Sequence, residues 1–200
     1  MLNRSGNLQR FVDATEAGIR AQATRFSAAM PMADRIFTAL KDIGDVGTRN
    51  SQPRLAVCGH LETAFGQARG GPDPIPALAD ALAAIEPELA WSRRPGSAEL
   101  SADFYDGHAN AVLFGEGGLE ARQDLRIGVS LVAPGIHYPR HRHPPEELYV
   151  VLSPGEWMQG DNPFAFRRSG DLVHNTPNLW HAMLATDVPL LAVWCLWEKD

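Results

Sequence analysis

The stretch that decides the fold is Gly135-Ile-His-Tyr-Pro-Arg-His-Arg-His-Pro-Pro-Glu-Glu-Leu-Tyr149. Within it, His141, His143, Glu147 and Tyr149 all occupy odd-numbered positions. Odd positions share one face of an extended strand, because successive side chains in a strand point to opposite sides. If the adjacent prolines make only a local turn, two imidazoles, a carboxylate and a phenol converge on one point.

This side-chain set predicts a metal site. Two imidazoles and a carboxylate that leave coordination positions open suit a divalent ion such as Zn, Fe, Mn or Ni. A lone His-x-His pair usually carries no function, but a second segment, from Gly170 to His181, supplies a further imidazole from a later strand. We therefore predict that His143, Glu147 and His181 hold a metal ion. His141 is either a fourth ligand or a donor beside the ligands.

Composition describes an ordinary globular protein. The 200 residues are 44% hydrophobic and 21% charged, enough for one large domain or one domain with an appended part. The net charge of −6 argues against a nucleic-acid partner, because phosphates require a basic surface. The sequence shows neither the apolar segment of a signal peptide nor a membrane-length apolar run, so we expect a cytoplasmic protein with no membrane segment. Cys58 and Cys195 are expected to be buried apolar residues.

Residues 1–100 are predicted to be a helical region. Apolar residues recur there at spacings of three and four, and proline or glycine interrupts each run. This region carries no catalytic constellation, so we expect it to cover one face or the mouth of the second region and to exclude water. Dimerisation is the alternative role. The predicted helices span residues 7–30, 32–43 and 76–90, residues 66–76 form a loop, and residues 48–60 are ambiguous.

Residues 101–200 are predicted to be mainly β. Helical periodicity stops near residue 100, and short β-type runs separated by glycine and proline turns begin. About eight short strands at this spacing favour a sandwich or a barrel of the jelly-roll kind. The expected strands are 109–114, 125–133, 146–152, 155–160, 163–168, 171–174, 180–186 and 189–197.

The two clusters resemble the paired motifs of the cupin superfamily. Gly135, His141, His143 and Glu147 follow the first cupin motif, although its closing glycine, Gly155, comes one residue late. In the second motif the glycine at 170, the proline at 177 and the histidine at 181 match, whereas alanine replaces asparagine at 185. The resemblance implies a cupin metal-binding barrel at residues 101–200, preceded by the helical region.

A narrower resemblance is to the DddQ-type dimethylsulfoniopropionate lyases. A cupin barrel behind a helical region of this length, with His-x-x-x-Glu-x-Tyr and a distant histidine, is similar to that family. The resemblance implies a metal-dependent carbon–sulfur lyase that splits a zwitterionic sulfonium substrate into dimethyl sulfide and acrylate. Tyr149 and Tyr138 match the two tyrosines that belong to the family's site.

The implied reaction is a β-elimination that needs a base. Tyr149 shares the expected inward face with the ligands, so it can touch the metal and supply a phenolate. Simple alternation points Tyr138 outward, although a bulge near Pro139 would turn it back. We favour Tyr149 as the base, with Tyr138 and His141 binding the substrate, or Tyr138 as an alternative base. A sulfonium cation binds favourably over an aromatic ring. The candidates for this contact are Trp180, which we rank first, and Trp194, Trp197, Phe164 and Phe166.

Three other functions remain open at this point. A cupin fold also serves metal-dependent dioxygenases and isomerases, because function belongs to the site and not to the fold. A non-catalytic cupin that binds a metal or a ligand would not need Tyr149. A fusion to a DNA-binding helix-turn-helix is disfavoured by the charge balance of residues 1–100.

Overall fold

A computed structural model describes residues 4–47 and 54–199 of the chain. Residues 48–53, the first part of the segment that the sequence leaves ambiguous, lie outside the described residues. None of the described helices combines the length and the apolar character that a membrane crossing requires.

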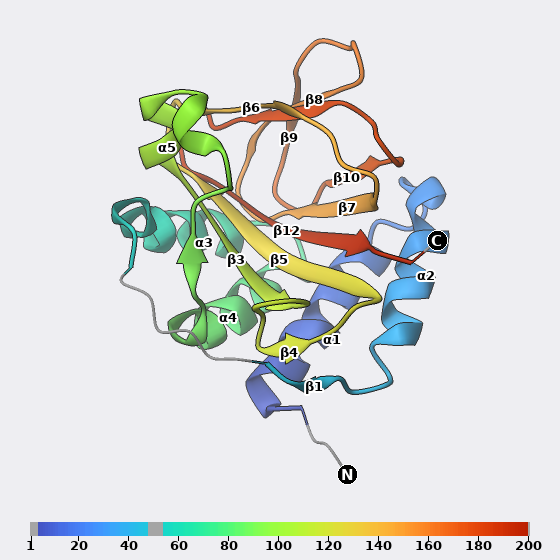
Figure 1. The fold of residues 1–200 in the computed structure, drawn as a ribbon. Helices are drawn as coiled ribbons and strands as arrows, with labels where there is room; N and C mark the ends of the chain where they lie inside the picture. The colour runs from blue at the N-terminus through green and yellow to red at the C-terminus, as the bar shows by residue number, and fades with distance from the viewer. Residues whose placement is uncertain (1–3, 48–53, 200) are drawn as a thin grey trace.

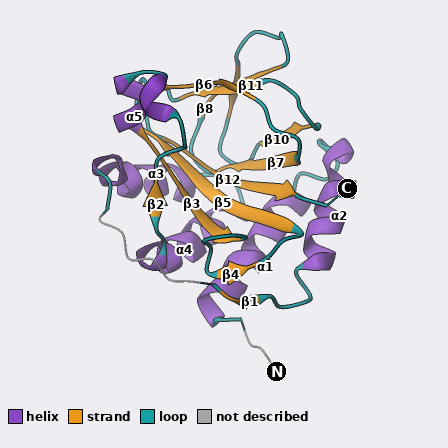
Figure 2. Cartoon of the chain, viewed as in Figure 1, coloured by secondary structure: helices purple, strands orange, loops and turns teal. Residues whose placement is uncertain are grey.

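Two sheets form the barrel that the sequence predicts (Figures 1 and 2). In the large sheet the strand order is β1-β4-β3-β5-β12-β7-β10, and β2 pairs with β3. The small sheet has the order β6-β11-β8-β9. This arrangement confirms the mainly β, cupin-type fold. The strands are β1 (Asp45–Val46), β2 (Trp91–Ser92), β3 (His108–Phe114), β4 (Glu120–Ala121), β5 (Leu125–Val132), β6 (His137–His141), β7 (Glu146–Val151), β8 (Gly155–Gln159), β9 (Ala165–Arg167), β10 (Leu172–Asn175), β11 (His181–Leu184) and β12 (Leu190–Trp197).

Helices cover the outer face of the large sheet (Figure 1). The first three contact its strands β7 and β12, and the fourth packs on the first and third. The fifth helix lies beside β6 at the other end of the barrel. The α-helices are α1 (Gly6–Arg20), α2 (Met30–Ala39), α3 (Leu61–Arg69), α4 (Ile75–Ile85) and α5 (Ala102–Gly107), and short 3-10 turns occur at Ser27–Ala29, Ala56–His60, Glu86–Glu88 and Ser97–Glu99.

The protein has two hydrophobic cores, one on each side of the large sheet. The helix–sheet core joins residues such as Phe11 and Leu82 of the helices to outward residues such as Val129 and Val193 of the strands. The barrel core lies between the two sheets and includes Trp157. Large-sheet strands are therefore apolar on both faces, which is why β5 and β12 read as almost continuous apolar runs. Both cysteines are buried, as predicted.

The sequence misplaced some helices. The predicted helix 7–30 ends at Arg20, and a turn separates it from α2. Helix α3 continues through Arg69 into the segment predicted as a loop, and α5 was not predicted, because six residues are too few to show a helical period. Strands β1, β2, β4 and β6 were also absent from the predicted set.

A β-bulge in β6 corrects the simple alternation argument. His141 pairs with His181, but Tyr138 pairs with Met183, so three steps on β6 face two on β11. The additional residue turns Tyr138 into the barrel, where it is buried, and leaves His137 exposed. The bulge near Pro139 thus replaces the outward orientation that alternation gives to Tyr138.

Candidate metal centre

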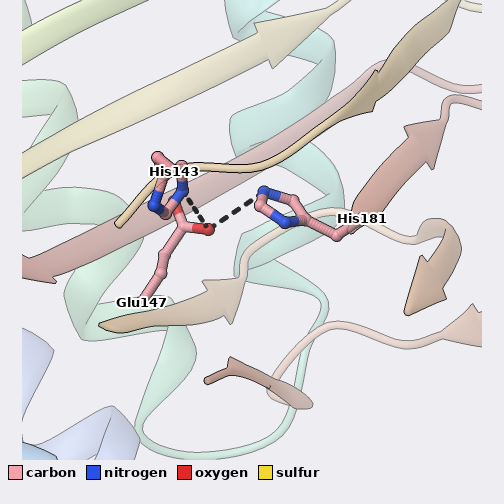
Figure 3. A group of neighbouring side chains, drawn as sticks. All are labelled: His143, Glu147 and His181. Carbon is pink, nitrogen blue, oxygen red and sulfur yellow. Dashed lines mark hydrogen bonds and ion pairs between the residues drawn. The ribbon is translucent and has the colours of Figure 1, made fainter. Parts of the chain in front are cut away.

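His143, Glu147 and His181 form a compact group between the two sheets (Figure 3). Glu147 belongs to β7, His181 begins β11, and His143 lies in the turn between β6 and β7. One ligand atom from each residue lies within 4.8 Å of the others. Both imidazole Nε2 atoms are 3.2 Å from the same carboxylate oxygen, Glu147 Oε2. A divalent ion with bonds of about 2 Å would need only small rotations to bind all three.

The histidines are oriented through their other ring nitrogens. The Nδ1 atoms of His141, His143 and His181 lie 2.9, 3.0 and 2.9 Å from the backbone carbonyl oxygens of Pro139, Pro145 and Leu179. Each carbonyl can only accept, so in the neutral ring Nδ1 donates and the lone pair is on Nε2. This is the usual support for metal-binding histidines. All three rings are therefore oriented to offer Nε2 as a ligand.

One buried atom of the group is left without a good partner. His181 Nε2 is fully enclosed and makes no hydrogen bond of acceptable geometry, even though Glu147 lies beside it. An orphaned buried nitrogen is costly unless something binds it. The amide of Asn175 donates to Glu147 Oε2 at 3.1 Å and helps to hold the carboxylate in place. The donor set fits a divalent ion.

The charges in the group favour a cation. Burial raises the pKa of Glu147, but the adjacent imidazoles outweigh it and lower this pKa to about 2. Burial opposes protonation of His143, yet the Glu147 carboxylate raises the pKa of His143 overall. Burial, followed by the neighbouring His181, lowers the pKa of His141 to about 3. An ionised carboxylate thus faces imidazoles, and a metal ion would replace the proton between them.

A cavity of about 230 Å³ opens beside this group and contains both predicted tyrosines. Tyr149 is buried, and the nearby Glu147 carboxylate helps to raise the pKa of its phenol. Tyr138 is buried and packs edge-on against Phe104, with 4.7 Å between ring centroids. His141 also lines the cavity. The structure therefore brings together every predicted metal ligand and both phenols.

Trp180 lies outside this arrangement. It is 38% exposed, and the guanidinium carbons of Arg140 and Arg142 sit 5.2 and 4.7 Å from its ring centroid. Alternation explains the placement, because its neighbour His181 points inward. Its position does not support the substrate contact that we expected of it.

Trp194 is the tryptophan that lines the cavity. It lies on β12 opposite Tyr149 of β7 and Gly128 of β5. A Cβ at Gly128 would come within 2.2 Å of the Trp194 ring, so glycine is needed there for the ring to lie flat along the wall. Asn110 and Arg94, which sequence reasoning missed, also line the cavity. Their signal is tertiary, since neither belongs to a motif.

Comparison with known proteins agrees with this picture. The sequence profile of the dimethylsulfoniopropionate lyase family matches residues 29–192. The chain is also 34% identical over 125 residues to dimethylsulfoniopropionate lyase DddQ of Ruegeria pomeroyi. That match spans 62% of this chain and 62% of the relative, so the aligned part is less than two thirds of the curated protein.

Solved structures resemble the fold over nearly its full length. The crystal structure of DddQ from Ruegeria pomeroyi superposes with a TM-score of 0.64 at 26% identity and covers 90% of this chain and 91% of its own. A structure from a study of the lyases RdDddP and RnDddQII gives a TM-score of 0.69 at 24% identity, covering 96% and 92%. Because the profile matches most of its residues, the chain belongs to the dimethylsulfoniopropionate lyase family.

Proposed function

We propose that this protein cleaves dimethylsulfoniopropionate into dimethyl sulfide and acrylate by a metal-dependent β-elimination with Tyr149 as the base. One observation carries the proposal. A metal-ligand triad and two buried tyrosines converge on one small cavity in a member of a lyase family. A dioxygenase or an isomerase finds no comparable support in the family match.

The reaction needs a base and stabilisation of negative charge from the site. Tyr149 removes a proton from the carbon next to the substrate carboxylate, the electron pair forms the carbon–carbon double bond, and the carbon–sulfur bond breaks to release neutral dimethyl sulfide. The proton stays on the phenol oxygen until solvent accepts it. A divalent ion bound to His143, Glu147 and His181 would supply Lewis-acid stabilisation of the negative charge that develops on the carboxylate.

Tyr149 needs positive charge nearby to act as a base. Burial, followed by the Glu147 carboxylate, raises the pKa of Tyr149 well above its ordinary value. A cation held by the triad would offset both effects and favour phenolate. Burial also raises the pKa of Tyr138, and its hydrogen bond to Asn110 counteracts this. Tyr149 is favoured because it lies two residues from Glu147 on β7, near enough for the carboxylate to influence its pKa. Tyr138 is assigned to substrate binding or to the alternative base.

The sulfonium group requires an aromatic wall. Trp194 presents its ring to the cavity next to Tyr149 in the sheet. Cations bind favourably over such faces, and tryptophan is the best of them. We therefore assign this contact to Trp194, one of the aromatic candidates from the sequence, in place of Trp180.

The test measures dimethyl sulfide by gas chromatography after incubation with dimethylsulfoniopropionate. Protein stripped by a chelator should be inactive, and Zn, Fe, Mn and Ni added back separately should identify the ion that restores activity. Tyr149→Phe should lose about 10²- to 10⁴-fold in kcat while still binding metal. Tyr105→Phe, a tyrosine that does not line the cavity, is the matched control and should keep full activity.

Each alternative has its own outcome in this test. Undiminished turnover by Tyr149→Phe would remove Tyr149 as base, and loss in Tyr138→Phe alone would assign that role to Tyr138. Oxygen consumption without dimethyl sulfide would indicate a dioxygenase. An inert protein with every metal would indicate a binding cupin. The cytoplasmic location and a possible homodimer stay predictions.

A further inference from the structure

Among the described residues, three arginines line the cavity, and they differ in what their guanidinium groups bind. Arg93 is occupied, because its Nε donates to the Tyr105 carbonyl at 2.7 Å and its Nη2 lies 3.1 Å from Asp106. The Arg94 guanidinium makes no hydrogen bond or ion pair within residues 4–47 and 54–199. An arginine beside a cavity without a partner of its own is available to a ligand.

The Arg94 guanidinium stands over the proposed reaction site. Its central carbon lies 5.9 Å from the centroid of the Tyr138 ring. The Arg94 charge also acts against the burial that raises the pKa of Tyr149, and it contributes to the lowered pKa of His141. Arg94 therefore adds positive charge on the side of the cavity that both phenols share.

A buried side chain fixes the backbone of Arg94, although this residue belongs to a connecting segment. Its N–H donates to His108 Nε2 at 2.9 Å, so that nitrogen must carry a lone pair. The other ring nitrogen, Nδ1, then carries the proton and donates to the Phe104 carbonyl. The His108 ring is completely buried and stacks on Phe104 with 3.9 Å between centroids. This neutral, oriented imidazole holds the Arg94 segment at the edge of the cavity.

We propose that Arg94 binds the carboxylate of the substrate and so determines that the site accepts a small carboxylate-bearing zwitterion. The inference rests on the proposed function for the identity of that zwitterion. A carboxylate has two oxygens, and the planar guanidinium fork matches one carboxylate edge. Within the cavity lining, the acidic residue is Glu147, which is committed to the triad, so an incoming carboxylate meets Arg94 without a competing anion from that lining.

Arg126 provides the matched control. It lines the same cavity from β5, and its buried Nε atom has no hydrogen-bond partner among the described residues. Its side chain packs over Gly115, where an added Cβ would come within 2.7 Å of the arginine Cγ. Both arginines line the same cavity, and neither guanidinium has a hydrogen-bond partner among the described residues. Arg94 is the one that lies over the Tyr138 ring. Carboxylate binding should therefore depend on Arg94 and not on Arg126.

The experiment measures binding of propionate and of propionamide, its uncharged isostere, by ligand-observed NMR. The proteins are the wild type, Arg94→Gln, Arg94→Lys and Arg126→Gln, each both stripped of metal and loaded. Arg94→Gln should weaken propionate binding about tenfold or more in both forms, since a charge-assisted hydrogen bond is lost, and should leave propionamide unchanged. Arg94→Lys should recover part of the loss, and Arg126→Gln should bind like the wild type.

Several results would overturn the proposal. It fails if the wild type binds no propionate, or if Arg94→Gln binds it as tightly as the wild type does. It also fails if Arg94→Gln loses as much affinity for propionamide as for propionate, or if Arg126→Gln loses more affinity for propionate than Arg94→Gln does. If Arg94→Gln unfolds, Arg94→Lys decides, because a folded lysine variant without any loss of propionate binding would exclude the fork contact. In kinetics Arg94→Gln should raise KM more than it lowers kcat. A protein that releases no dimethyl sulfide yet binds propionate through Arg94 would reject the proposed function and keep this inference.

Discussion

The two sheets of the barrel differ in what covers their outer faces. Helices α1 to α4 lie over the large sheet, so its strands are buried on both sides. The small sheet has a buried inner face, but its outer face exposes Phe166, and Phe164 just before β9 is exposed as well. The barrel core lies between the sheets, and the candidate ligands Glu147 and His181 come one from each sheet. One side of the large sheet thus packs against helices alone, whereas the other side holds both a core and the candidate site.

This difference explains the role of the helical region. Within residues 4–47 and 54–100, most of the buried side chains complete the helix–sheet core. Their final segment is the exception, since Arg93 and Arg94 line the cavity. Strands β1 and β2 of this region also join the large sheet. The division at residue 100 remains an interpretation of composition.

A large effect on stability is expected in the helix–sheet core. Phe11 of α1 is completely buried there, so Phe11→Ala should lower the free energy of unfolding by about 3–5 kcal/mol. Urea denaturation checks the loss. At low temperature the folded fraction should keep its kcat, because Phe11 lies outside the barrel core. A kcat that falls together with stability would show that the two cores are not separable.

A moderate effect is expected from pH at the junction of the large sheet and α5. Burial lowers the pKa of His108 below its ordinary value of 6.5. Between pH 6.5 and this lower pKa, His108 binds a proton in the unfolded chain but not in the folded protein. Stability therefore falls as the pH drops below about 6.5, and it stops falling below the pKa of the folded state. His108→Gln should flatten the profile of free energy of unfolding against pH by up to about 1.4 kcal/mol per pH unit.

The measurement is chemical denaturation of metal-free protein at a series of pH values. His141, with its pKa lowered to about 3, contributes a slope of the same sign in both proteins, so the difference between the proteins isolates His108. Parallel profiles would mean that the folded protein protonates the His108 ring as readily as the unfolded chain does, contrary to its role as acceptor for Arg94.

The smallest effect is expected on the bare face of the small sheet. Phe166 in β9 is 53% exposed, so Phe166→Ser should change the free energy of unfolding by no more than about 0.5 kcal/mol. Trp157, on the paired strand β8 and 2% exposed, is the contrast, and its truncation to alanine should cost about 3–5 kcal/mol. A large loss from Phe166→Ser would show that something covers this face in solution.

Local patterns predicted much of this molecule. Helix α2, the later strands and the ligand spacing are visible because each follows a period or a motif. The bulge in β6 is different, since it depends on pairing with β11 and reverses the direction of Tyr138. Helices α3 and α5 were missed because a short helix does not repeat its apolar face often enough.

By itself the sequence predicted that His143, Glu147 and His181 would come together, because the motif spacing in neighbouring strands leaves little freedom. Only the tertiary structure decided which aromatic and cationic side chains join them. Trp194 lines the cavity and Trp180 lies outside it because of the positions that they take along the chain next to inward-facing residues. Arg94 lines the cavity because His108 holds the connecting segment in place. Such contacts join residues far apart in the chain, so no local pattern encodes them.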